Sequence, residues 1–231
     1  MEKFEKIREL EQKTGYHFQK FDWLVLAMRH SSYTNEHHME RLECNERLEF
    51  LGDAVLELIS SEFLYKNYPE MAEGELTKLR ASLVCEPTLA YDARALSLGD
   101  YLLLGKGEEA TGGRQRDSIV SDAMEAVIGA IFMDGGFEAA KRFILQFVMD
   151  DVENKQLFHD SKTLLQEMMQ KKEPEEEVSY VILEEAGPDH DKSFKAQVRI
   201  GDRPLGEGMG RSKKSAEQNA AYHALCRMKK R

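Results

Sequence analysis

Apolar residues recur at helical spacing through the first part of the chain, from residue 4 to about residue 150. Side chains three or four positions apart lie on the same face of an α-helix, so this pattern predicts a mainly helical region. Polar and glycine-rich stretches interrupt it near residues 67–74, near Gly99, along residues 105–118 and at Gly135 and Gly136. These interruptions leave several helices of ordinary length.

The pattern changes after residue 160. Residues 178–186, 192–201 and 203–210 alternate apolar and polar positions or carry β-branched side chains, which favours strands. Helical spacing appears on either side of them, with Ser161 and Ser212 as candidate N-caps. The order α-β-β-β-α predicts a small α+β domain that follows an all-α domain. Polar residues 150–161 resemble a linker, so we expect domains at residues 1–155 and 156–231.

The charge is unevenly distributed along the chain. The net charge of −10 argues against nucleic acid as a partner, but residues 211–231 carry seven basic residues and one acidic residue. A local basic patch can bind phosphate on an acidic protein. Three cysteines with no Cys-x-x-Cys pair argue against a disulfide framework and a cysteine-based zinc site. The sequence offers no membrane-spanning apolar run and no secretory signal, which favours a cytoplasmic protein with no membrane partner.

Residues 45–60 combine an apolar helix with a stripe of carboxylates. Glu46, Glu49 and Asp53 fall within roughly 60° of one another around the helix, and Glu57 extends their line. The opposite face is expected to hold Leu48, Leu51, Val55, Leu58 and Ile59, with Phe50 and Leu56 on the flanks. The simplest interpretation of the stripe is the solvated face of an amphipathic helix.

A second helix, predicted near residues 118–133, favours a different interpretation. It is apolar nearly all round, and its only charges in residues 118–133 are Asp122 and Glu125. A buried carboxylate without a partner costs several kcal/mol, so a cation should accompany this pair. Hard divalent ions suit carboxylates, which indicates Mg²⁺ or Mn²⁺. A di-iron site is disfavoured because no Glu-x-x-His pair is present. Two such ions can hydrolyse a phosphodiester.

Residues 45–59 resemble the signature stretch of the ribonuclease III family, and the resemblance continues through residues 73–84, 104–136 and the C-terminal part. It implies an Mg²⁺-dependent endonuclease that cuts double-stranded RNA. By position, the metal-binding catalytic carboxylates would be Glu49, Asp53, Asp122 and Glu125. Glu46 and Glu73 match two further acidic positions with supporting roles, whereas Glu57 lies one turn beyond and is expected to be structural or solvated.

The resemblance also implies a symmetric homodimer. Phe50 matches the residue that packs across the interface, although an ordinary core position would suit it as well. Two sites in one dimer would leave 5′-phosphate and 3′-hydroxyl ends with two-nucleotide 3′ overhangs. Processing of ribosomal RNA precursors and of messenger RNA would be the expected tasks.

The basic end has its own signature. Residues 206–218 match neither a Walker A loop nor a dinucleotide-binding loop. They do include the predicted start of a helix with two lysines in its first turn, and such a helix start favours binding of an anion. Together with the α-β-β-β-α order, the segment resembles a double-stranded RNA-binding domain. That resemblance implies RNA binding at Ser212, with phosphate contacts at Lys213 and Lys214, and minor-groove contacts at Thr163, Gln166, Glu167 and His190.

Two alternatives remain open from the sequence. An RNA-binding regulator that holds duplexes without cutting them would need only the C-terminal domain. In the loop at residues 106–116, Arg114 and Arg116 could contact RNA or be solvated.

Overall fold

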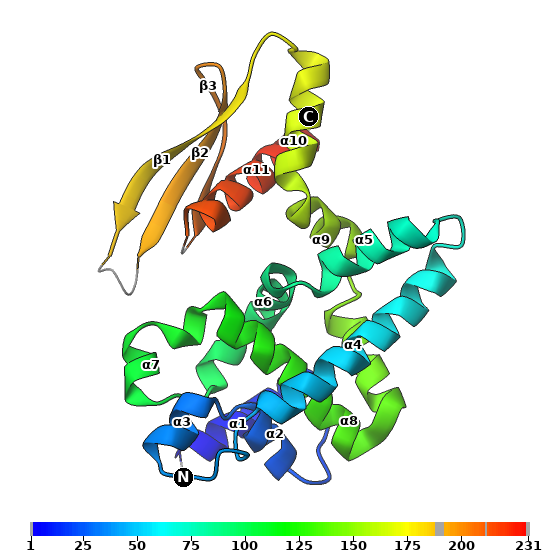
Figure 1. Ribbon diagram of the computed structural model, residues 1–231, viewed down its shortest axis with the longest axis vertical. Coiled ribbons are helices and arrows are strands. Elements are labelled where there is room, and N and C mark those ends of the chain that lie inside the picture. The colour runs from blue at the N-terminus through cyan, green and yellow to red at the C-terminus, as the bar shows by residue number, and fades with distance from the viewer. Residues whose placement is uncertain (1, 188–191, 211, 230–231) are drawn as a thin grey trace. The chain divides into compact units, whose positions relative to one another are not determined.

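The computed structural model describes residues 2–187, 192–210 and 212–229 (Figure 1). The chain divides into two compact units, Met1–Val152 and Glu153–Arg231, each with its own hydrophobic core. The sequence predicted the domain boundary after residue 155, slightly beyond Val152. As a boundary between functions it stays a prediction. None of the described helices has both the length and the apolar composition needed to cross a membrane.

The first unit is helical, as predicted. In chain order its elements are α1 (Glu2–Thr14), α2 (Asp22–Ala27), α3 (Ser31–Glu36), α4 (Glu46–Asn67), α5 (Glu73–Val84), α6 (Glu86–Ala95), η1 (Leu98–Tyr101), α7 (Lys106–Ala110), η2 (Gly113–Gln115) and α8 (Asp117–Phe147). The break predicted at Gly135 and Gly136 is a kink inside α8, where Gly136 has a φ of +73°. Residues 105–118, which the sequence predicted as a break between helices, contain the short helices α7 and η2.

The core of the first unit forms where α4 packs against α8. Leu48, Val55, Leu56 and Ile59 of α4 are buried, but Leu58 is 59% exposed. Leu58, expected on the face opposite the carboxylates, is therefore not part of this core. Gly52 is the point at which α4 contacts α8. Leu56 lies about 40° around the helix from Gly52, whereas Leu58 lies about 120° from it, so α8 covers only the former.

The second unit has the predicted order of strands and helices. Its elements are α9 (Val152–His159), α10 (Ser161–Lys172), β1 (Val178–Ala186), β2 (Ser193–Ile200), β3 (Arg203–Gly210) and α11 (Lys213–Lys229). The strands form an antiparallel sheet in the order β1-β2-β3. Both α10 and α11 lie on one face of this sheet (Figure 1). A Cβ atom at Gly208 would lie 2.2 Å from the Ala220 nitrogen, so β3 and α11 approach with backbone almost in contact.

The predicted linker is mostly a helix, α9, and packs on the second unit. Gln218 Nε2 of α11 donates to the carbonyl oxygens of Phe158 and His159, both at 2.6 Å. The Phe158 ring meets the Tyr222 ring edge to face at 5.5 Å. Tertiary contacts of this kind stabilise a short polar helix that its own sequence does not favour.

The two predicted N-caps have different outcomes. Ser212 caps α11, because its Oγ accepts from the backbone N–H of Ser215 at 3.1 Å. Ser161 is instead the first residue of α10 and its Oγ donates to the carbonyl of Gln218, so that prediction was wrong. The contact with α11 uses the hydroxyl that a cap would need.

Candidate metal centre and nucleic-acid interface

Two glycines set the crossing of α4 and α8. A Cβ atom at Gly52 would lie 1.8 Å from the carbonyl oxygen of Glu125, and one at Gly129 would lie 2.2 Å from the carbonyl oxygen of Leu48. The two backbones therefore touch, with no side chain between them. Glu49 lies one turn before Gly52, and Glu125 one turn before Gly129, so the close crossing brings carboxylates from both helices together.

Three carboxylates meet at this crossing. Glu49 of α4 and Asp122 and Glu125 of α8 each offer one oxygen, and these oxygens lie within 4.8 Å of one another. All three side chains are partly buried. We call these three residues the acidic cluster. Within the part of the chain that the structure describes, no Lys or Arg forms an ion pair with it.

The acidic cluster holds its protons unusually tightly. Burial, followed by the charges of Asp122, Glu46 and Asp53, raises the pKa of Glu49 to about 7. Burial, followed by the charges of Asp53, Asp122 and Glu49, raises the pKa of Glu125 to about 8. Burial also raises the pKa of Asp122, with Glu86 as the next cause. Oxygen ligands that repel one another and have no counter-charge fit a hard divalent cation.

The remaining predicted acidic residues lie around the cluster or apart from it. Asp53 and Glu46 are exposed, and both act electrostatically on Glu49. Glu73 is the exposed first residue of α5 and accepts from Thr77 Oγ1 at 3.1 Å. Glu73 is not among the charges that raise the pKa of Glu49, Asp122 or Glu125. Within the described chain, the structure thus brings three of the six predicted carboxylates together, with Asp53 and Glu46 beside them, and leaves Glu73 outside.

Phe50 is on the outside of α4. Its side chain is 79% exposed, and Tyr65 further along the helix is 76% exposed. The alternative interpretation of Phe50 as an ordinary core residue was therefore wrong. Together with Leu58, these residues form an exposed apolar stripe along α4, which we call the α4 stripe.

His30 is near one member of the acidic cluster, Asp122, and the sequence did not single it out. Burial lowers its pKa, while the charges of Glu108, Asp122 and Glu46 act in the opposite direction. The imidazole therefore lies in the electrostatic field of Asp122, one member of the acidic cluster. No periodicity or spacing pointed to it, because His30 stands alone before the short helix α3.

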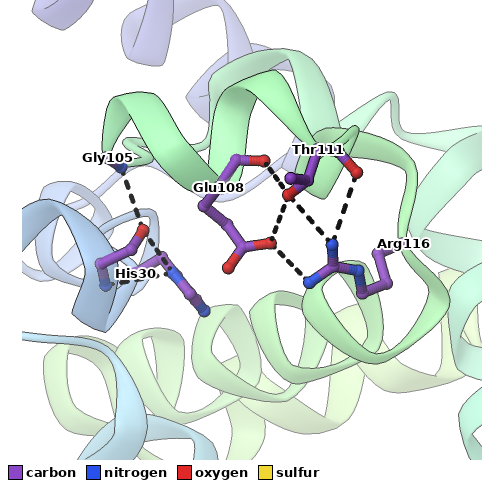
Figure 2. Close-up of polar contacts among 6 residues, drawn as sticks. His30, Gly105, Glu108, Thr111 and Arg116 are labelled. Atoms are coloured by element: carbon purple, nitrogen blue, oxygen red, sulfur yellow. Dashed lines mark hydrogen bonds and ion pairs between the residues drawn. The ribbon is translucent and has the colours of Figure 1, made fainter. Parts of the chain in front are cut away.

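Arg114 and Arg116 both have partners within the first unit. Arg114 pairs with Glu109 and donates through Nη1 to the carbonyls of Gly99 and Leu102, both at 2.8 Å. Arg116 pairs with Glu108 and donates to Thr111, as Figure 2 shows. These contacts fix the segment that contains α7 and η2 against the rest of the first unit.

The predicted RNA-binding residues of the second unit lie on two separate elements. On α10, Thr163, Gln166 and Glu167 are exposed and, at spacings of three and four residues, share one face. At the start of α11, Lys213 and Lys214 are exposed beside the cap residue Ser212. Lys213 Nζ lies 4.0 Å from a carboxylate oxygen of Glu185. His190 lies outside the described residues.

Comparison with known proteins agrees with this arrangement. A family model described as ribonuclease-III-like matches residues 22–152, and one for a double-stranded RNA binding motif matches residues 161–228. The chain is 50% identical over 222 residues to ribonuclease 3 of Caldanaerobacter subterraneus subsp. tengcongensis, covering 95% of this chain and 96% of that protein. It is 48% identical over 230 residues to ribonuclease 3 of Bacillus velezensis, covering 99% and 92% respectively.

The first unit is also similar to a solved nuclease-domain structure. The nuclease domain of ribonuclease III from Campylobacter jejuni superposes with a TM-score of 0.58 and 45% sequence identity, covering 62% of this chain and 95% of that one. That structure is described as showing flexibility in a region involved in dimer formation. From the two family models and the near-complete coverage of its relatives, the chain belongs to the ribonuclease III family.

Proposed function

We propose that the acidic cluster, with Asp53 beside it, binds Mg²⁺ and that the protein uses this site to hydrolyse phosphodiester bonds of double-stranded RNA. The supporting observation is the set of three convergent, half-buried carboxylate oxygens without a counter-charge among the described residues. Mn²⁺ should substitute, because it also accepts carboxylate and water ligands. When bound, the metal supplies an acidified water and neutralises charge on the phosphate.

The protein's own groups prepare the site for that chemistry. Glu49, Asp122 and Glu125 offer the ligand oxygens, and two of them must release protons that their raised pKa values retain near neutral pH. Asp53 and Glu46 add exposed negative charge next to the cluster, which strengthens its attraction for a divalent cation. Glu73, outside the cluster, is proposed to have a supporting role.

The second unit would hold the duplex. Lys213 and Lys214 at the start of α11 combine two ammonium groups with a helix N-terminus, which favours phosphate. Thr163, Gln166 and Glu167 present exposed polar groups that can reach ribose hydroxyls in a minor groove. Such contacts select A-form shape over base sequence. A contact from His190 stays a prediction.

The α4 stripe supports a homodimer. Large exposed apolar side chains along one side of a helix favour a protein interface, and a second copy of the same helix would cover Phe50. Two cutting sites in one dimer would give 5′-phosphate and 3′-hydroxyl ends with two-nucleotide 3′ overhangs. Ribosomal RNA precursors and messenger RNA in the cytoplasm would be its substrates.

The test is cleavage of a long RNA duplex by the full chain, with Mg²⁺ and then with EDTA, followed by sequencing of the product ends. We expect cleavage only with the metal and a two-nucleotide stagger between the strands. Duplex binding without metal-dependent cleavage would instead support the RNA-binding regulator. Single-stranded RNA of the same sequence is the matched control and should stay intact.

A further inference from the structure

The His30 ring is held in one orientation by groups on two segments. Its Nδ1 accepts from the backbone N–H of Ser32 at 3.2 Å, which makes His30 the N-cap of α3. Ser32 Oγ lies 2.8 Å from the same nitrogen and accepts from the backbone N–H of Gly105 at 3.0 Å. The backbone N–H of His30 also donates to the carbonyl of Leu103. Figure 2 shows the ring fixed between α3 and the start of α7.

These contacts determine which ring nitrogen carries the proton. A backbone N–H can only donate, so the Nδ1 that faces Ser32 must be unprotonated. The proton of the neutral ring is therefore on Nε2. In the described chain, Nε2 has no hydrogen-bond partner and its N–H is available to a ligand.

His30 lies next to the start of α4, because the backbone N–H of Asn45 donates to the carbonyl oxygen of Arg29 at 2.8 Å. Asp122 of the acidic cluster acts electrostatically on the His30 ring. Glu108, Asp122 and Glu46 all act electrostatically on His30, and Arg116 acts against them. Glu108 is already engaged, since it pairs with Arg116 and accepts from Thr111. A half-buried donor that points to no protein acceptor is suited to an acceptor that arrives with the substrate.

We propose that the Nε2–H of His30 donates a hydrogen bond to a non-bridging oxygen of the RNA phosphate at the acidic cluster. This inference rests on the proposed function, because it adds a substrate contact at the same site. A neutral donor suits the position: it can bind a phosphate oxygen, whereas a fixed positive charge from Lys or Arg would repel a divalent cation nearby. His30 would thus position the scissile phosphate without weakening the metal site.

Two substitutions separate this role from that of the helix cap. Asn at position 30 places an acceptor near the position of Nδ1 and is a favoured N-cap, but it has no donor at Nε2. Gln reaches further and places an amide donor near Nε2, but it loses the Nδ1 acceptor. Single-turnover cleavage of a long duplex should fall about 10- to 100-fold in His30→Asn, the usual range for a hydrogen bond to a charged group. His30→Gln should retain a rate within several-fold of the unmodified protein.

Three further measurements make the outcome decisive. Duplex affinity in EDTA, Mg²⁺ affinity and the midpoint of thermal unfolding should be unchanged in His30→Asn. The proposal is overturned if His30→Asn cuts normally, if both variants lose activity equally, or if Mg²⁺ affinity falls as far as the cleavage rate. A loss confined to His30→Gln would indicate only a structural cap. If the unmodified protein does not cut with Mg²⁺, the proposed function itself fails.

Discussion

Replacing Gly52 with alanine should damage the metal centre without removing any of its carboxylates. The added Cβ would lie 1.8 Å from the carbonyl oxygen of Glu125, far inside the shortest contact that a real Cβ makes. The clash is between two helix backbones, so no flexible side chain can move aside. Helices α4 and α8 must separate by more than about 1 Å to relieve it.

The magnitude follows from that separation. Overpacking in a well-packed core costs about 1–3 kcal/mol, and a backbone clash belongs at the upper end of this range. For a domain of this size, such a loss lowers the unfolding midpoint by roughly 6–12 °C. Mg²⁺ requires ligand distances within a narrow range near 2.1 Å, so moving Glu49 away from Glu125 should weaken the site. A displacement of about 1 Å can reduce a catalysed rate about 100-fold.

The assay combines thermal unfolding, Mg²⁺ titration calorimetry and duplex cleavage. Gly74→Ala is the matched control, since a Cβ atom there has no neighbour within 4 Å and Gly74 is also helical. That control should be neutral or slightly stabilising. If Gly52→Ala melts within 2 °C of the unmodified protein, as a rough limit, and binds Mg²⁺ equally well, the close crossing does not shape the site.

Five further predictions concern metal, RNA and assembly. Bound protons should compete with the cation, because the pKa values of Glu49 and Glu125 are raised to about 7 and 8. The apparent Mg²⁺ affinity should therefore rise with pH through this range and then level off. Calorimetry in buffers of different ionisation enthalpy would show the released protons, and an affinity independent of pH would refute the assignment. The raised pKa values of Glu49 and Glu125 also make the stability of the metal-free fold depend on pH. Their contribution to stability is fully present below the ordinary pKa near 4.5 and is lost as the pH rises to about 8. The thermal midpoint in EDTA should therefore fall over this interval and recover with Mg²⁺. Glu125→Ala should abolish cleavage while duplex affinity, measured by gel shift, stays nearly unchanged; equal loss of both would contradict its role as a metal ligand. Lys213→Ala with Lys214→Ala should reduce the slope of log affinity against log salt concentration by about 2, and an unchanged slope would exclude phosphate contacts. Phe50→Glu should shift the protein toward a monomer in sedimentation experiments, whereas Met133→Glu, a charge at another exposed apolar position, should not.

Local signals predicted the second unit closely. Its strands follow alternation and β-branched side chains, and Ser212 caps α11 as its position before the helix indicated. In these segments, local preference and tertiary packing favour the same structure. The convergence of Glu49 with Glu125 was also predictable, because an apolar helix does not bury charges without a reason.

The errors arose where a distant partner decides the outcome. Helix α9 depends on Gln218 of α11, which is distant from it in sequence. The exposure of Leu58 depends on where α8, also distant in sequence, packs against Gly52. His30 was missed for the same reason, since Gly105 and the charges of Glu108 and Asp122 come to it only in the folded chain. Periodicity reports which face of a helix is apolar, but not which part of that face a neighbour covers.

Helix α9 changes what should count as a transplantable RNA-binding module. The family motif begins at residue 161, yet Gln218 of α11 satisfies carbonyls at Phe158 and His159, and Leu157 is 7% exposed within the same core. A chimaera that joined residues 161–231 to a foreign nuclease would strip the amide of Gln218 of both acceptors and uncover part of that core. Recombination between relatives would therefore preserve the module best when the exchange point falls before α9.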